Sequence, residues 1–197
     1  MAQQSRADLN ALFLAGAEPT AANFEDVFTS NLNLEDDSVI TGAITTASVT
    51  KGLVTLVATG AITAAAHAGR TLLMGEVGGN AIATFTLPAA TGTGNVYKFV
   101  VSVVNTSNYV IQVVGDDTID GKVFVANDVA NHASNNSVIV WKTAADSDTI
   151  TLDGTTTGGV SIGDYVELID IAADQWSVSG MLEQSGTEAT PFSAAVS

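Results

Sequence analysis

The chain has 197 residues, of which 46% are hydrophobic and only 14% are charged. This composition excludes an intrinsically disordered protein, because disorder requires low hydrophobicity and high charge. The longest apolar runs, such as residues 96–104, are far shorter than the roughly 18 residues of a membrane-spanning helix, so we expect no membrane partner. No apolar signal region follows the first residues, and we therefore do not expect secretion through a signal peptide.

The chain is strongly acidic. Its 21 acidic and 6 basic residues give a formal net charge of −15 at pH 7. Binding to nucleic-acid phosphates requires clustered lysine and arginine side chains. The cations here are scattered along the chain, so we expect no nucleic-acid partner. The absence of cysteine excludes disulfides and thiolate chemistry.

The first 37 residues follow a helical pattern. Apolar side chains recur at spacings of three and four over residues 5–14, and again over a second segment that ends near Asn31. Gly16 and Pro19 separate the two segments, and Thr20 is a suitable N-cap for the second. The apolar faces consist of Leu9, Leu12, Phe13, Phe24, Val27, Phe28 and Leu32. The pattern predicts a short two-helix arm over residues 1–37.

Such an arm is too short to be ordered by its own contacts. Burying four of its large side chains contributes roughly 6–12 kcal/mol in total. Fixing some thirty backbone residues costs about 1–2 kcal/mol for each residue. We therefore interpret residues 1–37 as a docking arm that packs on its own domain, on sister subunits or on another protein.

Residues 38–66 are rich in threonine, alanine and glycine. The pentapeptide Thr-Gly-Ala-Ile-Thr occurs at residues 41–45 and again at residues 59–63. This repeat is typical of a β-ribbon or linker, and the alternative is that it marks two unrelated hairpin edges.

The remainder of the chain predicts a mainly β domain. Short runs rich in valine, isoleucine and threonine are separated by Gly, Asn and Asp turns, without intervening helices. The ten candidate strands are 53–58, 70–74, 82–87, 96–104, 109–114, 122–125, 137–142, 149–152, 165–169 and 175–180. We expect an antiparallel β-sandwich or jelly-roll-like domain over residues 67–182. Residues 183–197 predict an extended C-terminal tail, in which Pro191 and Phe192 clamp a neighbouring subunit.

The motifs that resemble catalytic sites lack the necessary context. Residues 159–163 match the G-x-S-x-G pattern of a nucleophile elbow, but a strand follows them where the elbow requires a helix. Both His67 and His132 precede Ser161, whereas the triad histidine of that fold follows the serine. We interpret the motif as a glycine-flanked turn that enters a strand, and we expect no enzymatic activity.

Two acidic turns are candidates for calcium binding. The loop that begins at Asp116 partly resembles a calcium loop, but Asn127 stands where a bidentate glutamate is required. A second acidic turn contains Asp146 and Asp148. These turns either hold a structural Ca²⁺ or are solvated turns whose aspartates bond their own backbone. We expect no bound metal and no other cofactor.

The two tryptophans lie in alternating strand patterns at Trp141 and Trp176. We interpret them as anchors of the core or of a subunit interface. The alternative is a platform on which a sugar ring stacks.

Several segments resemble proteins of tailed bacteriophages. Residues 13–24, FLAGAEPTAANF, followed by Phe28-Thr29-Ser30, resemble an N-terminal arm of phage head and fibre proteins, although Thr29 replaces a common aspartate. Residues 84–97, 144–155 and 186–193 resemble phage proteins that decorate capsids or form short head fibres. The resemblance covers much of the chain and is carried by structural motifs, with no catalytic residue among them.

The resemblance implies a homotrimeric capsid cement or decoration protein. Such a protein is made in the host cytoplasm, binds the major capsid protein on the exterior of the head and stabilises the virion. The alternative is a head or tail fibre protein that recognises a host-surface receptor such as a glycan. A depolymerase would require a cleft with two facing carboxylates, and nothing in the sequence singles out such a pair.

Overall fold

The computed structural model describes residues 52–76, 81–105, 107–127 and 138–196. The chain divides into two units, Met1–Val49 and Thr50–Ser197, and all the described residues belong to the second unit. The predicted helical arm of residues 1–37 lies outside the described residues and stays a prediction.

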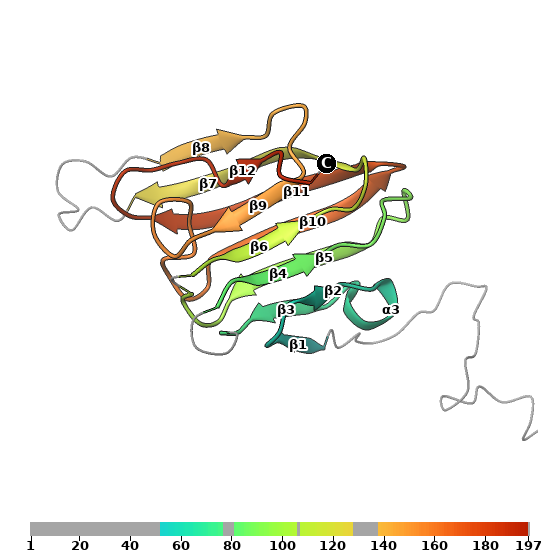
Figure 1. The fold of residues 1–197 in the computed structure, drawn as a ribbon, viewed down its shortest axis with the longest axis horizontal. Coiled ribbons are helices and arrows are strands. Elements are labelled where there is room, and N and C mark those ends of the chain that lie inside the picture. Colours follow the sequence, from blue (N-terminus) through green and yellow to red (C-terminus); the bar gives the residue numbers. More distant parts are fainter. Residues whose placement is uncertain (1–51, 77–80, 106, 128–137, 197) are drawn as a thin grey trace, which may run out of the picture. The chain divides into compact units, whose positions relative to one another are not determined.

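The described residues of the second unit form two β-sheets and one short helix (Figure 1). In spatial order, the seven-stranded sheet contains β1 (Leu53–Leu56), β3 (Thr71–Met74), β5 (Val96–Val101), β10 (Tyr165–Ala172), β11 (Gln175–Gln184), β7 (Thr118–Asn127) and β8 (Val138–Lys142). The five-stranded sheet contains β12 (Phe192–Ser193), β9 (Thr149–Leu152), β6 (Tyr109–Gln112), β4 (Ala83–Thr86) and β2 (Gly60–Ala61). The helix is α3 (Ala64–His67), which Thr63 caps.

Both sheets are mixed, which corrects the prediction of antiparallel sheets. Strands β1, β3 and β5 run parallel in the larger sheet, as do β2, β4 and β6 in the smaller one. The reason is that the chain alternates between the sheets from β1 to β6. Each return to a sheet therefore follows a crossover, and a crossover brings the next strand in parallel.

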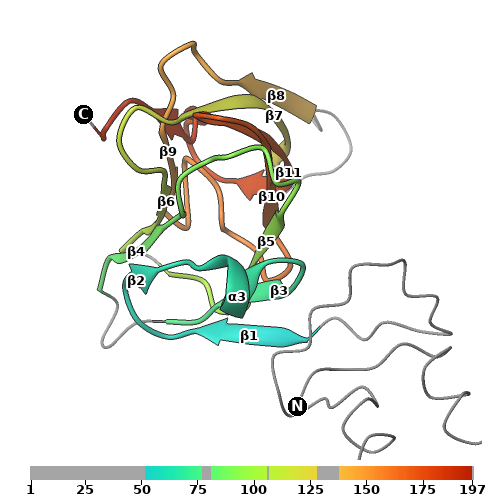
Figure 2. The same ribbon diagram turned by 90° about the vertical axis from the view of Figure 1, so that its right-hand side faces the viewer.

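The hydrophobic core lies between the two sheets, which face each other as layers in Figure 2. Buried residues alternate with more accessible ones along β10 and β11, so that one side of each strand enters the core. The rings of Phe85 and Phe99 stack across the layers with centroids 6.1 Å apart. Trp176 is 0% exposed and contacts Tyr97 edge-on at 5.6 Å, which confirms the interpretation of Trp176 as a core anchor.

Each of the ten predicted strand segments overlaps an observed strand. One boundary difference concerns β7, which begins at Thr118, before the predicted segment 122–125. Gly121 is therefore inside the strand, with a φ of 150°. A Cβ atom at this position would lie 2.1 Å from the carbonyl oxygen of Val178 in β11. The glycine is thus required by the close approach of two strands rather than by a turn.

The two ends of the predicted β-sandwich segment also differ from the prediction. Residues 53–66 of the predicted ribbon or linker form β1, β2 and part of α3, and the two strands belong to different sheets. At the other end, β11 continues to Gln184, and β12 pairs with β9. Part of the predicted tail is therefore a strand of the five-stranded sheet.

The core predicts a difference between two phenylalanines. Phe85→Ala removes a ring that is 0% exposed, and we expect the free energy of unfolding to fall by about 3–5 kcal/mol. Phe124→Ala removes a ring that is 46% exposed, so this replacement should lower the free energy of unfolding by only about 1 kcal/mol. Urea unfolding at low protein concentration measures both values. Equal losses would contradict the placement of the core.

Candidate functional site

Most of the predicted docking residues lie outside the described residues, namely Leu9, Leu12, Phe13, Phe24, Val27, Phe28 and Leu32. The other two, Pro191 and Phe192, are buried within the domain. Phe192 is 7% exposed and pairs with Ile150 in β9. The carbonyl oxygen of Pro191 accepts a hydrogen bond from the amide of Thr151. Their side chains are committed to the fold of their own chain, which differs from the clamp on a neighbouring subunit that the sequence predicts.

Buried carboxylates hold the turns of the domain together. Asp170 is 3% exposed, and its oxygens accept hydrogen bonds from the amides of Thr91 (2.9 Å), Gly92 (2.6 Å) and Thr93 (3.1 Å). The Thr93 hydroxyl donates a further bond at 2.6 Å. Burial by itself raises the pKa of Asp170, but these four bonds outweigh it, and the net pKa is lowered. The carboxylate stays ionised and closes the turn that precedes β5.

Three more aspartates act in the same way. Asp117 accepts from the amide of Ala90 at 2.7 Å and from the indole Nε1 of Trp176 at 3.2 Å. Asp148 accepts from the backbone amides of residues 195 and 196 and so fixes the end of the chain beyond β12. Burial raises the pKa of Asp164, although amides that include those of residues 159 and 183 donate to it. These acids support the fold, and none is paired with a second carboxylate across a cleft in a way that suggests hydrolysis.

The G-x-S-x-G segment is a turn that leads into a strand, as the sequence predicts. Residues 161–163 form a bend and turn, and β10 begins at Tyr165. The hydroxyl of Ser161 donates to the carboxylate of Glu183. No helix follows the serine, so the backbone geometry of a nucleophile elbow is absent from this segment.

The remaining candidate ligands have local structural roles. The amide of Thr63 donates to Nδ1 of His67 at 2.9 Å, which closes the single turn of α3. Asp120 accepts from the hydroxyl of Thr143 at 3.2 Å. In the described parts of the chain, no three His, Asp or Glu side chains are grouped closely enough to hold a metal ion. His132 lies outside the described residues.

Trp141 lies on the core side of the seven-stranded sheet. It pairs with Val123, which is buried, and its ring packs partly against the core. Its Nε1 donates to Oε1 of Gln184 at 3.1 Å. With Trp176 fully buried, the two tryptophans do not form an open platform for a sugar ring.

The outer face of the seven-stranded sheet carries a continuous line of apolar side chains. Residues that pair directly across strands lie side by side on one face. One such line crosses all seven strands and is apolar on every strand except β1, where it ends at a threonine, and we call it the apolar row. Its members, from β8 to β1, are Val140, Phe124, Met181, Tyr165, Val100, Leu73 and Thr55. Phe124, Val140 and Met181 are 46%, 47% and 59% exposed, so the row is open to solvent at the β8 side of the sheet.

A second line of paired residues runs beside the apolar row on the same face. Its members are Lys142, Lys122, Ser179, Glu167, Lys98 and Thr71, and we call it the lysine row. The lysines are scattered in the sequence, but the sheet brings them into register. They are three of the four lysine and arginine residues that the structure describes. The Nζ atom of Lys98 lies 4.1 Å from the centre of the Tyr165 ring, a cation–π contact that links the two rows.

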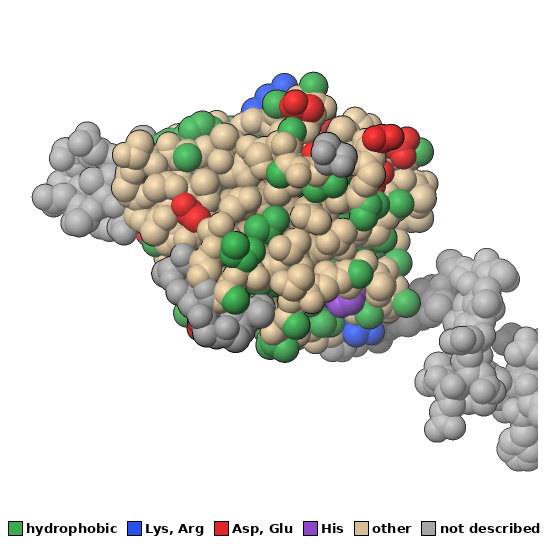
Figure 3. Space-filling view, in the orientation of Figure 1, with side chains coloured by type: hydrophobic (Ala, Val, Ile, Leu, Met, Phe, Trp, Pro, Cys, Tyr) green, Lys and Arg blue, Asp and Glu red, His purple; other side chains and the backbone are tan. Residues whose placement is uncertain are grey.

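The opposite face of the domain is chemically different. Outward positions of the five-stranded sheet are uncharged, for example Thr84, Val110 and Thr151, which pair across β4, β6 and β9. In Figure 3, which views this side, Lys and Arg atoms lie only at the upper and lower margins and acidic atoms gather toward the upper right. Three of the four described cations therefore lie on the outer face of the seven-stranded sheet, together with the acids Asp120, Glu167 and Glu183.

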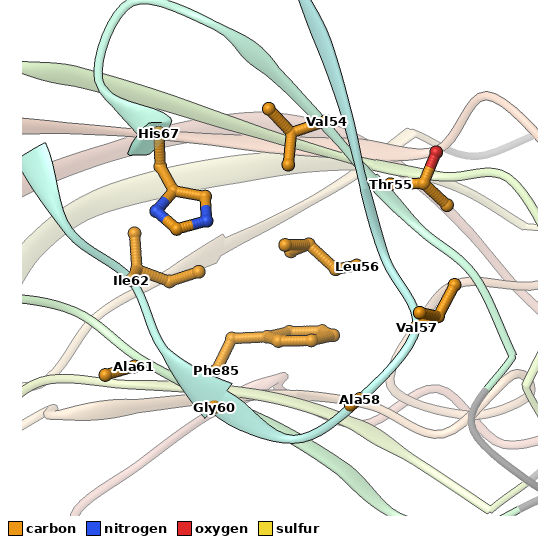
Figure 4. A pocket seen from close by; sticks show the side chains of 10 residues that line it. All are labelled: Val54, Thr55, Leu56, Val57, Ala58, Gly60, Ala61, Ile62, His67 and Phe85. Carbon is orange, nitrogen blue, oxygen red and sulfur yellow. The ribbon is translucent and has the colours of Figure 1, made fainter. Parts of the chain in front are cut away.

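An apolar pocket of about 270 Å³ lies between β1 and β2. Figure 4 shows Leu56, Ile62 and Phe85 around this space, with the ring of His67 beside Ile62. Leu56 and Ile62 are buried, and Phe85 forms part of the core. The pocket suits an apolar side chain rather than a polar substrate.

The chain matches no protein-family model, no curated protein sequence and no solved structure. None of the helices in the described ranges is long and apolar enough to span a membrane.

The buried carboxylate of Asp170 predicts a pH-dependent effect on stability. Its pKa is lower in the folded chain than in the unfolded chain, so its contribution is complete above a pH of about 4 and is lost as the pH falls through the folded pKa. We expect Asp170→Asn to reduce the free energy of unfolding by about 1.5–3 kcal/mol at pH 7. The difference in the free energy of unfolding between Asp170→Asn and the unmodified chain should become smaller in acid.

Urea unfolding at a series of pH values measures this difference. Asp174→Asn is the matched control, because Asp174 is exposed in the adjoining turn and its replacement should have little effect. If Asp170→Asn lowers the free energy of unfolding by the same amount at neutral and at strongly acidic pH, the structural role of the carboxylate is contradicted.

Proposed function

We propose that this chain is a structural protein of a tailed-bacteriophage particle. In this proposal it is a homotrimeric decoration or cement protein that binds the major capsid protein on the outside of the head, and its domain is a β-sandwich. The observation that carries the proposal is the division of the chain into an N-terminal unit, Met1–Val49, and a compact two-sheet unit. The sequence of the first unit resembles the arms of phage head and fibre proteins.

The chemistry of the described residues supports a binding role rather than catalysis. The buried acids Asp117, Asp148, Asp164 and Asp170 accept hydrogen bonds from backbone amides, so they are engaged in closing turns. The exposed surface instead offers an apolar row and a lysine row on a regular sheet. Such a surface is suited to contact with another protein.

The mechanism in this proposal is stabilisation through binding. A protein that binds the assembled shell, and not its separated subunits, makes the shell harder to open. A trimer that contacts several capsid subunits at once also gains from effective concentration, because each contact holds the others in place. No covalent step is required.

One feature favours the alternative of a receptor-binding fibre protein. A polar pocket of about 340 Å³ lies at the ends of β7, β8 and β11. It is lined by hydrogen-bonding side chains that include Asp120, Lys142, Thr143 and Gln175. These groups could orient a small polar ligand such as a host-surface glycan, although neither tryptophan lines the pocket.

The copy number in the particle separates the two functions. Quantitative mass spectrometry of purified particles gives the ratio of this chain to the major capsid protein. A cement protein should be present at a copy number comparable with the number of capsomers. A far lower copy number, of the order of a dozen per particle, would favour the fibre protein, and absence from the particle would reject both.

Removal of residues 1–37 tests the docking role of the arm. We expect the shortened chain to keep the cooperative unfolding of the β domain, since the described core contains no residue of this segment. We expect it to lose binding to capsids, measured by co-sedimentation. Full capsid binding by the shortened chain would defeat this part of the proposal.

Phe24→Ala and Phe192→Ala form a matched pair. Phe24 is predicted to dock, so its replacement should weaken capsid or subunit association and leave the melting temperature of the domain unchanged. Phe192 is 7% exposed in the core, so its replacement should destabilise the domain by about 3–5 kcal/mol. Sedimentation and thermal unfolding distinguish the two effects. Loss of domain stability in Phe24→Ala would show that this ring belongs to the core.

A further inference from the structure

We propose that β8, the edge strand of the seven-stranded sheet, pairs antiparallel with the same strand of a second copy of this chain. The pairing joins two domains into one continuous sheet around a twofold axis. The inference goes beyond the proposed function, because it requires neither the capsid nor the N-terminal unit. A twofold contact does not build a threefold group by itself, so in a homotrimer it links one trimer to the next.

Strand β8 is the longest of the four edge strands that the structure describes. It has five residues, whereas β1 has four and β2 and β12 have two each. Proteins protect sheet edges with short strands, proline, bulges or charged side chains. β8 has no proline, pairs with β7 in unbroken register, and carries one charged side chain, Lys142, at its end. Figure 2 shows β8 at the margin of its sheet, beyond β7.

The backbone groups of β8 that face away from β7 belong to Val138, Val140 and Lys142. The amide of Thr143 donates to the carbonyl oxygen of Gly121. Hydrogen-bonded pairs alternate along an antiparallel ladder, so every second residue counted back from Thr143 bonds to β7. Within the described ranges, no residue bonds the amides or carbonyls of the three residues between them. They form a row of donors and acceptors that a further strand completes.

The side chains of β8 make the strand complementary to itself. An antiparallel pair centred on Val140 aligns all five residues, with Ile139 opposite Trp141 and Val138 opposite Lys142 of the second copy. Ile139 and Trp141 are half-buried and pack partly against the core, and pairs of an aromatic and a β-branched side chain stabilise neighbouring strands. Val140 meets Val140 of the second copy and continues the apolar row from one sheet into the next. This self-complementarity identifies a second copy as the occupant.

Charge selects this arrangement among the possible pairings of two β8 strands. A parallel pair in register would place Lys142 beside Lys142 of the second copy, which is unfavourable. The antiparallel pair centred on Val140 separates the two lysines by four residues, or about 14 Å. The line of paired residues that contains Lys142 then continues in the second copy through Val138 and Ala126 to Glu183. It therefore leads toward a charge of opposite sign.

The size of the contact fits a weak dimer. Val138, Val140 and Lys142 each exchange two backbone hydrogen bonds with their counterparts, and the apolar side chains of β8 cover one another. A standard interface buries about 1,200–2,000 Å² in total, which is more than one pair of five-residue strands provides. We therefore expect an equilibrium between single and paired copies, which a high local concentration shifts toward the pair.

Disulfide trapping tests the pairing on the full chain, which contains no cysteine of its own. Val140→Cys places one thiol on the twofold axis, where the Cα atoms of a hydrogen-bonded pair are about 5.5 Å apart and within reach of a disulfide. Under mild oxidation without capsids, we expect a product of twice the 20.0 kDa of one chain. Leu53→Cys is the matched control, because Leu53 is an exposed apolar residue on the opposite edge strand, β1. Its yield of product should be about tenfold lower.

A mixture of two variants tests the register. Val138→Cys and Lys142→Cys should each give little product alone, and the mixture should give a yield close to that of Val140→Cys. Adding Val140→Lys to both partners of the mixture places like charges opposite each other and should lower the yield about tenfold. Val140→Lys in one partner and Val140→Glu in the other should restore it. Thermal unfolding checks that each variant folds, and melting temperatures should change little because these positions are exposed.

Three results would overturn the inference. The first is a yield for Val140→Cys no greater than that for Leu53→Cys. The second is a yield for Val138→Cys alone that equals the yield of the mixture, which would exclude the antiparallel register. The third is a yield that Val140→Lys leaves unchanged, or that Val140→Glu in the other partner does not restore. Because trapping is measured without capsids, a chain that forms the disulfide but fails to bind capsids rejects the proposed function and leaves this inference standing.

Discussion

The register of the seven-stranded sheet is the constraint on which the rest of the structure depends. Val123, Val166 and Phe99 are fully buried on one side of their strands, and a slip of one residue would exchange that side for the other. The cost of exposing these side chains fixes the pairing. Once the pairing is fixed, Phe124, Met181 and Tyr165 must lie in one line on the outer face, and Lys122 and Lys142 must lie beside them. The surface that we interpret as functional is therefore a consequence of core packing.

The acidic residues divide into two groups with different consequences. Those that are buried, such as Asp170 and Asp117, accept backbone amides and hold long connections against the sheets. Those in exposed turns, such as Asp116 and Asp146, contribute to the strong negative charge without a described structural partner in the core. We interpret the first group as support for the fold and the second group as the acidic part of its surface.

The sequence predicts the strands well because alternation and turn residues are local signals. It does not predict which strands are neighbours, since the pairing of β5 with β10 or of β7 with β11 joins segments far apart in the chain. The parallel pairs depend on crossovers between sheets, which leave no periodic signal. β2 and β12 are two residues long and are too short to show alternation. The lysine row was unpredictable for the same reason, because its three lysines are adjacent only after β5, β7 and β8 are placed. The docking role of the arm rests on sequence alone.

The most direct test of the proposed capsid role is a cryo-electron microscopy reconstruction of the phage particle that contains this chain. We expect density for the two-sheet domain on the exterior of the shell, in groups of three. Single, separated copies would contradict the homotrimer. A shell without this density would contradict the assignment of the chain to the capsid.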